Sequence, residues 1–253
     1  MRVMKRALLV IFAVVAYAWF LADIVWAIAF LADVGPFGTS HGPSTTALWA
    51  VLTNLSLLGV FAVHHSVMAR DGAKRVITRM VPAAAERSTY VLVASALLAL
   101  VLWQWRPIAG TVWDITAQPW QLLLWAGYGL GWLVAVAATF MIDHADFVGL
   151  RQAASQPGHY QPPTFREQWL YAWVRHPLML GLLMALWITP RMSTGHLLFA
   201  AASTAYIAIG IRLEERALRR HHGSSYEDYA TRVPALLPRP RRAVRSSATE
   251  VAR

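Results

Sequence analysis

Four small groups of ionisable side chains stand in an otherwise apolar chain, and their types suit proton transfer and the binding of charged ligands. A neutral histidine can accept a proton, and an adjacent arginine can stabilise the anion that is left behind. A pair of carboxylates can meet the cationic part of a ligand. The candidates are His64, His65 and Arg70; Asp143 and His144; Arg175 and His176; and Glu214 and Glu215.

The stretch from residue 171 to 240 brings two of these groups together. Pro177 suits the first turn of a helix, where its missing N–H costs nothing, so Arg175 and His176 lie just before that helix at its positive end. Two apolar helical segments follow, at residues 178–188 and 196–212, each short for a full membrane span. Glu214 and Glu215 come directly after the second segment. A helical hairpin therefore returns two carboxylates to the level of the arginine and the histidine.

The composition places the whole chain in a membrane. Of its 253 residues, 57% are hydrophobic and only 14% are charged, and its apolar runs reach the roughly 20 residues that cross a bilayer. The net charge of +10 comes from basic residues in loops and in the C-terminal tail, which fits the positive-inside rule better than a nucleic-acid surface. The absence of cysteine excludes disulfides, a cysteine nucleophile and cysteine-based metal sites.

We therefore predict an all-α integral membrane protein with five or six transmembrane helices, the last of them in a C-terminal helical hairpin. The first four predicted spans cover residues 7–32, 47–68, 88–105 and 120–142. Lys and Arg concentrate in alternate loops, which predicts that both termini face the cytoplasm. Residues 1–240 form a single membrane domain in this interpretation, and residues 241–253 form a basic, disordered tail.

This topology collects all four groups at the cytoplasmic face, where ionisable residues at bilayer depth mark a functional site. Neighbouring residues on a helix point about 100° apart, so His64 and His65 cannot both face such a site. Asp143 and His144 have an alternative role at the end of the fourth span, as a helix cap that meets the lipid headgroups.

The two adjacent glutamates are expected to differ. Glu215 has Arg212 and Arg219 at helical spacing and is expected to form a surface ion pair. Glu214 shares the apolar side of the helix and is the expected buried carboxylate. The nine histidines include no pair at i, i+3 or i, i+4 spacing, so no metal site is predicted.

The C-terminal part carries an ordered set of motifs: Arg175-His176-Pro177, Glu214-Glu215, Gly223-x-x-Tyr226-x-x-Tyr229 and Val233-Pro234-x-x-Leu237-Pro238. In this order and spacing it resembles the isoprenylcysteine carboxyl methyltransferase superfamily of membrane enzymes. One departure is Met179, where the family often has tyrosine, and it weakens the expectation of a prenyl-cysteine substrate. The resemblance implies that residues 171–240 bind S-adenosylmethionine at the cytoplasmic end of the hairpin. The implied cofactor-binding residues are Arg175, His176, Pro177, Gly181, Glu214, Tyr226, Tyr229 and Pro234.

Passages upstream of the hairpin resemble a narrower group, the bacterial methanethiol S-methyltransferases. They include the segments at residues 63–70, 81–90, 103–107 and 149–152. This resemblance implies methyl transfer to methanethiol, giving dimethyl sulfide, by a multi-pass protein of the bacterial inner membrane with a cytoplasmic active site. Two alternatives stay open: a methyltransferase for an isoprenoid or lipid acceptor, and a non-enzymatic membrane accessory protein of the denitrification-associated type.

Methyl transfer to a small thiol requires its ionisation, because the thiolate is the nucleophile and small alkyl thiols have pKa values above the value of about 8.5 for free cysteine. Either His64 or His65 with Arg70, or His144 beside Asp143, is the candidate base, and the sequence does not choose between them. On the donor side, the resemblance implies that His176 positions the donor and that Glu214 meets its cationic end or its ribose hydroxyls. The expected lid over the adenosine consists of Tyr226, Tyr229 and Pro234.

Overall fold

Five helices of the computed structural model, which describes residues 2–68, 70–156, 159–161 and 167–238, are long and apolar enough to cross a membrane. They are α1 (Arg2–Leu31), α2 (Ala47–Met68), α4 (Glu86–Trp103), α5 (Trp120–Ile142) and α9 (Thr194–His222). The prediction of an all-α membrane protein is confirmed, and the bounds expected for the second and fourth spans are those of α2 and α5. The tail at residues 241–253 lies outside the described residues.

The C-terminal hairpin is asymmetric, which corrects the prediction of two short segments. Its first helix, α8 (Pro177–Trp187), has 11 residues and rises about 16 Å, roughly half the apolar core of a bilayer. In contrast, α9 has 29 residues and rises about 43 Å. Residues 212–220 are all Arg, Leu, Glu or Ala, which are strong helix formers, so α9 continues beyond the end of its apolar run.

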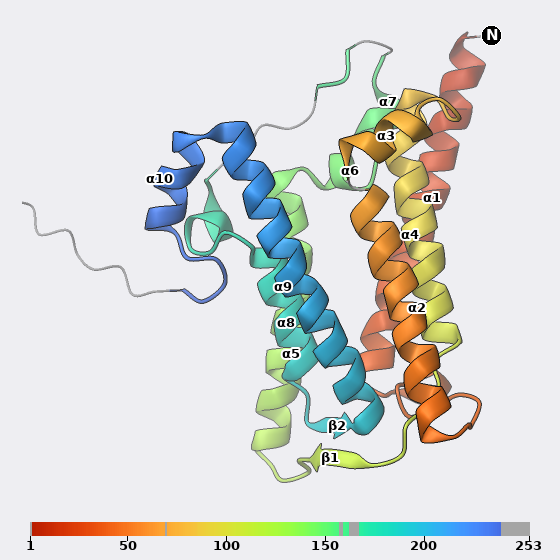
Figure 1. The fold of residues 1–253 in the computed structure, drawn as a ribbon, viewed down its shortest axis with the longest axis vertical. Helices are drawn as coiled ribbons and strands as arrows, with labels where there is room; N and C mark the ends of the chain where they lie inside the picture. The colour runs from red at the N-terminus through yellow and green to blue at the C-terminus, as the bar shows by residue number, and fades with distance from the viewer. Residues whose placement is uncertain (1, 69, 157–158, 162–166, 239–253) are drawn as a thin grey trace, which may run out of the picture.

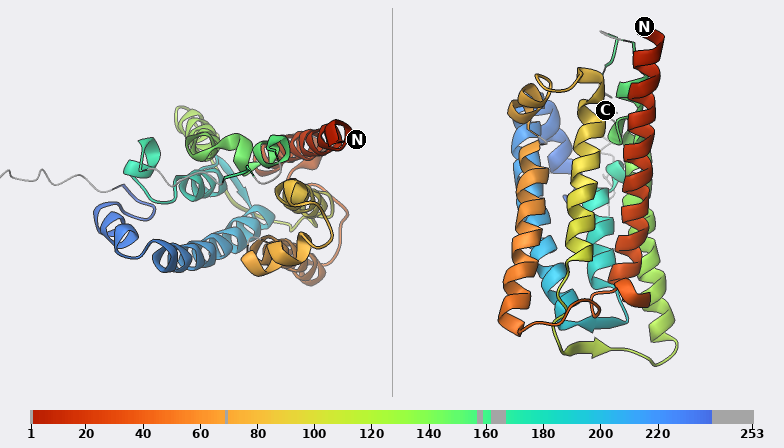
Figure 2. Two further views of the ribbon diagram at one scale, coloured as in Figure 1. Left: turned by 90° about the horizontal axis from the view of Figure 1, so that it is seen from above. Right: turned by 90° about the vertical axis from the view of Figure 1, so that its right-hand side faces the viewer.

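The long helices form two halves that α2 and α9 join. In one half α1 and α2 each pack on α4, and in the other α5 and α9 each pack on α8 (Figure 1). Two short helices, α6 (His144–Phe147) and α7 (Leu150–Ala154), lead from the end of α5 across to α1 (Figure 2). Buried aromatic side chains fill the space between the halves: the ring of Phe30 lies 5.6 Å from that of Trp105 and 5.4 Å from that of Phe199.

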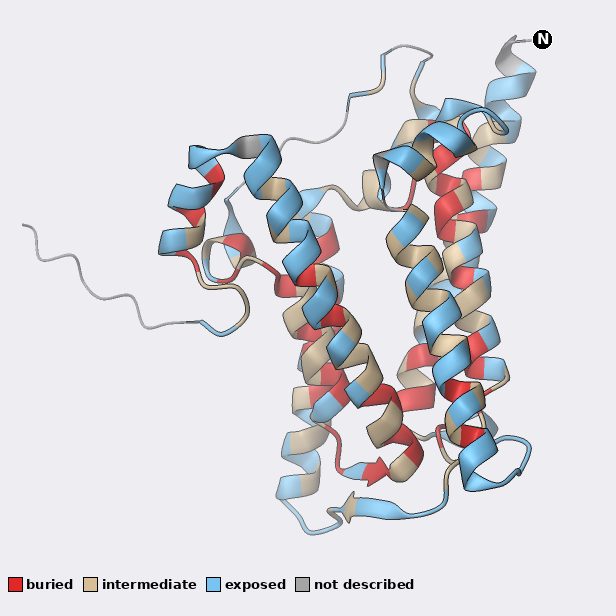
Figure 3. Ribbon diagram, viewed as in Figure 1, coloured by how far each residue is buried: buried red, intermediate tan, exposed pale blue. Residues whose placement is uncertain are grey.

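The contact between α5 and α8 is unusually close because it is lined by small residues. A Cβ atom placed on Gly181 would lie 2.4 Å from the backbone N of Ala135, and one placed on Gly131 would lie 2.7 Å from the backbone N of Ala185. Gly131 and Ala135 are four residues apart on α5, as Gly181 and Ala185 are on α8, the small-xxx-small pattern of close membrane-helix pairs. Both helices carry buried residues, which Figure 3 shows as patches behind α9.

A two-stranded antiparallel sheet, which the sequence did not predict, lies at the end of the bundle where α9 begins. It pairs β1 (Thr111–Asp114) with β2 (Arg191–Ser193), and Trp113 lies opposite Met192. The Trp113 indole donates a hydrogen bond of 2.9 Å to the carbonyl of Thr189. A short 3₁₀ helix, η1 (Gly35–Phe37), follows α1 at this same end. The sheet thus ties the turn of the hairpin to the loop before α5.

The other end of the bundle, here called the basic end, holds the start of α1 and the ends of α2, α5 and α9 (Figure 1). Arg6, Arg70, Lys74, Arg75 and Arg87 lie in its helix ends and connections. The remaining elements also lie there: α3 (Asp71–Ile77), η2 (Ala83–Ala85), η3 (Trp169–Ala172) and α10 (Ser224–Arg232). The expectation that the basic segments share one end is confirmed, while the side of the membrane that they face stays a prediction.

Candidate functional site

The candidate residues do gather at the basic end, but in three separate groups. The hairpin-end cluster consists of Arg175, His176, Glu214, Glu215 and Tyr226. The His65 cluster consists of His65, Ser66, Tyr90 and Tyr206. The His144 cluster consists of Tyr17, Thr139, Asp143, His144 and Arg151.

Arg175 connects α9 to the C-terminal segment, which consists of residues 224–238. Its Nε and Nη2 donate to Glu215 Oε1 at 2.9 and 2.5 Å, and its Nη1 donates to the carbonyls of Ala230 and Val233 at 2.9 and 2.5 Å. The side chain is 10% exposed. Four of the five guanidinium N–H groups have partners within the protein, so Arg175 holds the site together and has little capacity left for a ligand.

Backbone hydrogen bonds dock the same C-terminal segment onto the Arg-His-Pro loop. The N–H of Arg175 donates to the carbonyl of Pro234 at 2.9 Å, and that of His176 donates to Ala235 at 3.1 Å. The Tyr229 hydroxyl donates to the Tyr171 carbonyl at 2.7 Å. These contacts give Tyr229 and Pro234 a role in holding the segment, whereas a lid over a nucleoside stays a prediction.

The structure reverses the expected roles of the two glutamates. The side chain of Glu215 is 18% exposed and pairs with Arg175, while that of Glu214 is 51% exposed. The predicted ion pair of Glu215 with Arg219 does exist, at 3.8 Å. The assignment of Glu214 as the buried carboxylate was wrong because it considered only neighbours on the same helix, and the loop before α8 supplies the stronger partner of Glu215.

His176 lies between both carboxylates. Its Nδ1 is 3.5 Å from Glu214 Oε2, its Nε2 is 3.3 Å from Glu215 Oε1, and the residue is buried. The predicted helix start is confirmed, since Pro177 is the first residue of α8 and His176 occupies the N-cap position. Gly181 is buried one turn further along, in the contact with α5, and its role in binding the cofactor stays a prediction.

Tyr226 carries a polar atom that the protein leaves unused. Its hydroxyl is enclosed and has no hydrogen-bond partner among the described residues, although the ring lies edge-on to Tyr229. Burial raises the pKa of Tyr226, and Glu215 raises it further. The phenol is therefore neutral at physiological pH and can donate a hydrogen bond to a bound molecule.

The His65 cluster joins α2, α4 and α9. The Tyr90 hydroxyl lies 3.0 Å from Nδ1 and 3.1 Å from Nε2 of His65, and the imidazole stacks on Phe61. The Tyr206 ring meets the imidazole edge-on, and its hydroxyl is 3.2 Å from that of Ser66. His65 thus has aromatic and hydroxyl neighbours from three helices.

The other residues expected beside His65 are placed differently. His64 adjoins His65 along α2, and its enclosed Nδ1 has no hydrogen-bond partner among the described residues. Arg70 is exposed at the N-cap of α3, and the cation near Tyr90 is Arg87, which lies 5.3 Å from the ring centre. The sequence analysis did not include Tyr90 and Arg87 in the site. The available signal was their position as polar residues at the start of the apolar helix α4.

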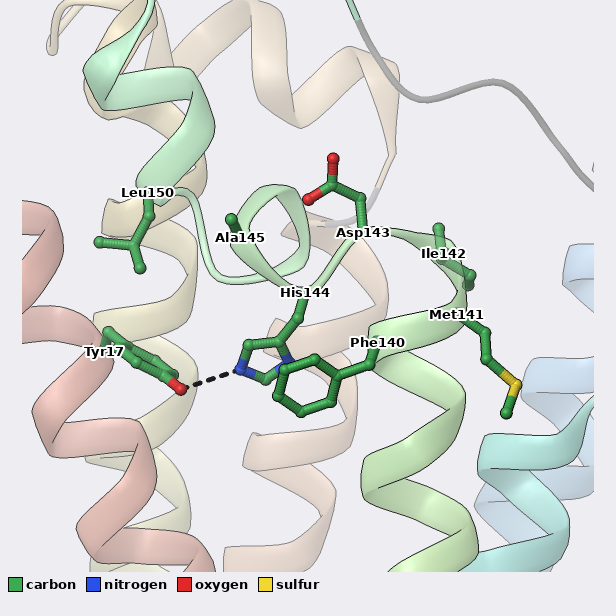
Figure 4. Close-up of a pocket in the computed structure, with 8 residues that line it drawn as sticks. All are labelled: Tyr17, Phe140, Met141, Ile142, Asp143, His144, Ala145 and Leu150. Atoms are coloured by element: carbon green, nitrogen blue, oxygen red, sulfur yellow. Dashed lines mark hydrogen bonds between the residues drawn. The ribbon is translucent and has the colours of Figure 1, made fainter.

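The His144 cluster lines an open pocket of about 550 Å³ between α1 and α5 (Figure 4). The Thr139 hydroxyl contacts both the Val136 carbonyl, at 2.7 Å, and His144 Nδ1, at 2.8 Å. Because a carbonyl only accepts, the hydroxyl hydrogen points to Val136 and His144 Nδ1 carries a proton. In the neutral ring Nε2 then accepts from the Tyr17 hydroxyl at 3.0 Å.

Asp143 serves as a helix cap rather than as a partner of the imidazole. Its carboxylate accepts from the backbone N–H of Asp146 at 3.0 Å, which caps α6, and also bonds Arg151. The capping N–H holds the pKa of Asp143 below its usual value, and Arg151 adds to this effect. The predicted cap of the fourth span is confirmed in position, since Asp143 is the C-cap residue of α5, but the helix that its side chain caps is α6. Within the described residues, no three His, Asp or Glu side chains converge as a metal site would require.

Acid should destabilise the His144 cluster. Burial lowers the pKa of His144 below its ordinary 6.5, and the charge of Asp143 offsets this only in part. Between these two pKa values the unfolded chain binds more protons than the folded protein, so stability falls as pH drops through 6.5. We expect the unfolding temperature to fall less between about pH 8 and pH 5 in His144→Gln than in the wild type. Equal pH dependence in both proteins would contradict this assignment.

Comparisons with known proteins identify relatives over nearly the whole chain. A methanethiol S-methyltransferase of Mycobacterium tuberculosis is 46% identical over 242 residues, which cover 94% of this chain and 99% of the relative. Methanethiol S-methyltransferase 2 of Bradyrhizobium diazoefficiens is also 46% identical, over 92% of this chain and 91% of the relative. Nurim of Mus musculus is 30% identical over 66% of this chain and 67% of nurim. No family model and no solved structure matches the chain.

Proposed function

The chain belongs to the methanethiol S-methyltransferase family, and from that premise we propose that it transfers a methyl group from S-adenosylmethionine to methanethiol and releases dimethyl sulfide. The observation that carries the proposal is the identity of 46% over 94% of the chain with a relative of that name. The likeness includes the region of the hairpin-end cluster, which offers a carboxylate and a phenol to a ligand.

The chemistry of the hairpin-end cluster fits this donor. S-adenosylmethionine is cationic at its sulfonium and amino groups, and it carries ribose hydroxyls. Glu214 is half-exposed and has one ion pair among the described residues, the long contact with His176, so its carboxylate can accept from such groups. Tyr226 can donate from its unused hydroxyl. Glu214, His176 and Tyr226 would therefore hold the donor, while Arg175 and Glu215 would keep these three residues in place.

The reaction needs positioning and exclusion of water more than a strong acid. When bound, S-adenosylmethionine supplies a methyl group on a cationic sulfur, and attack by a thiolate cancels both charges. The apolar helix α8, which begins directly after His176, gives surroundings of low polarity in which such a loss of charge is favoured. By the positive-inside rule, we place the basic end at the cytoplasmic face of the bacterial inner membrane.

The test is an assay of the gas phase above the purified protein. Detergent-solubilised protein is mixed with methyl-labelled S-adenosylmethionine and methanethiol, and labelled dimethyl sulfide is measured in the headspace. We expect the product to form only when protein, donor and thiol are all present. Absence of the labelled product from folded protein that retains donor binding would overturn the proposed acceptor. Absence of donor binding would overturn the proposed cofactor.

The two adjacent glutamates provide a matched pair for the donor site. Glu214→Gln should weaken donor binding by about 1–3 kcal/mol, roughly 5- to 150-fold in Kd, because a charged acceptor is lost, and it should leave thermal unfolding near wild type. Glu215→Gln should lower the unfolding temperature instead, because Arg175 loses its ionic partner. Calorimetric titration and thermal unfolding of both variants give the comparison. Wild-type donor affinity in Glu214→Gln would remove Glu214 from the site.

A further inference from the structure

We propose that the small thiol is bound and deprotonated at the His65 cluster, with His65 as the base and the hydroxyls of Tyr90 and Tyr206 as hydrogen-bond donors to the thiolate. This inference rests on the proposed methyltransferase function and names its acceptor site. The structural basis is the convergence of one imidazole and three hydroxyl groups from α2, α4 and α9.

The Tyr90 hydroxyl lies over the face of the His65 ring and not in its plane. The Tyr90 oxygen lies almost equally far from Nδ1 and Nε2, at 3.0 and 3.1 Å. A neutral imidazole has a lone pair on only one of these nitrogens, and that lone pair lies in the ring plane, so Tyr90 does not occupy it and a thiol can bind there. The Tyr90 hydroxyl, beside the ring, is then close enough to donate to the sulfur.

The cluster is reachable although it lies inside the bundle. His65, Ser66, Tyr206 and Phe61 are each only partly buried, where α2 packs beside α9 (Figure 1). The stacked and edge-on rings of Phe61 and Tyr206 on the imidazole leave aromatic surface for a methyl or other short alkyl group. Such surroundings suit a small apolar thiol and desolvate its sulfur.

One helix connects this cluster with the hairpin-end cluster. Tyr206 and Glu214 both lie on α9, eight residues apart, a rise of about 12 Å. His144, by contrast, donates to Thr139 on α5 and accepts from Tyr17 on α1, so both of its ring nitrogens are occupied. Its pocket lies beside Phe140, which is 62% exposed on the outside of the bundle. The contact of His65 with Tyr206 on α9 therefore favours His65 as the base.

The step balances in atoms and charge. The thiol proton moves to the lone pair of His65, and the sulfur forms a bond to the methyl carbon of the sulfonium donor. The bond from that carbon to the donor sulfur breaks, and its electron pair stays on the donor product. His65 then releases the proton to water. The titratable or charged groups that face His65 are His64 on α2, Tyr90 and Arg87 on α4 and Tyr206 on α9.

The test compares two thiols in His65 variants of the full-length protein. With methanethiol, His65→Ala and His65→Gln should lose about 10²- to 10⁴-fold in turnover at unchanged donor affinity. With an aromatic thiol that is largely ionised at neutral pH, most of this loss should disappear, because no base is then needed. The remaining methanethiol activity should rise about tenfold per pH unit until the thiol ionises. His41→Ala, at the opposite end of the bundle, is the control.

Each result has a defined meaning. Equal losses with both thiols, or full methanethiol turnover in both His65 variants, would overturn the inference, as would thiol-dependent rescue in His144→Gln in place of His65→Gln. Tyr206→Phe keeps the ring and should raise the KM for methanethiol without changing the donor Kd, so an unchanged KM would also count against the site. A wild-type protein that forms no dimethyl sulfide would instead contradict the proposed function.

Discussion

Replacing Arg175 with alanine is expected to release the C-terminal segment from the membrane helices. The substitution removes four hydrogen bonds and leaves Glu215 without its closest cationic partner. Removal of one member of a largely buried ion pair costs about 3–5 kcal/mol. We expect a marked fall in unfolding temperature, rapid proteolysis near residues 232–238, and loss of donor binding, because α10 and the loop before α8 would separate.

Arg219→Ala is the matched control for Arg175→Ala, since it removes the second and more exposed arginine beside Glu215, at 3.8 Å. An exposed pair of this kind contributes less than about 1 kcal/mol. Arg175→Lys tests the geometry, because a single ammonium cannot reach the carboxylate and both carbonyls. If Arg175→Ala unfolded like the wild type and kept its C-terminal segment protected from protease, Arg175 would not be what holds that segment to α9.

Gly131→Ala is expected to separate α5 from α8 and to lower stability by about 1–3 kcal/mol. The added methyl group would lie 2.7 Å from the backbone N of Ala185 and 2.8 Å from the carbonyl oxygen of Gly181, and neither backbone atom can rotate away. Because α8 begins at Pro177, its displacement should also shift His176 and weaken donor binding. Thermal unfolding and donor titration in detergent measure the two effects.

Gly129→Ala, two residues away on the same helix, is the control for Gly131→Ala. A Cβ atom at Gly129 meets nothing within 4 Å, and alanine is a better helix former than glycine by about 0.5–1 kcal/mol. Gly129→Ala should therefore be neutral or slightly stabilising. Equal stability of the two alanine variants would contradict the close packing of α5 on α8.

The sequence predicted which end of the bundle holds the candidate site and which residue types form it. It did not predict which of these side chains contact one another. The apolar runs bring His64, His65, His144 and His176 to one end of the bundle, as expected. The exchange of roles between Glu214 and Glu215 came from Arg175, which is 40 residues from Glu215 along the chain. Helical spacing compares only residues within one helix, so it could not include this arginine.

By itself, the sequence determined which segments form helices and which of their ends are basic. Both properties depend on consecutive residues: apolar length decides membrane insertion, and Pro177 or a run such as residues 212–220 starts or extends a helix. Only the tertiary structure decided that Tyr90 meets His65, that Tyr17 meets His144, and that glycines bring α5 against α8. These contacts depend on how each helix is rotated about its axis and where it crosses its neighbours, and many weak contacts along the whole bundle set that geometry together.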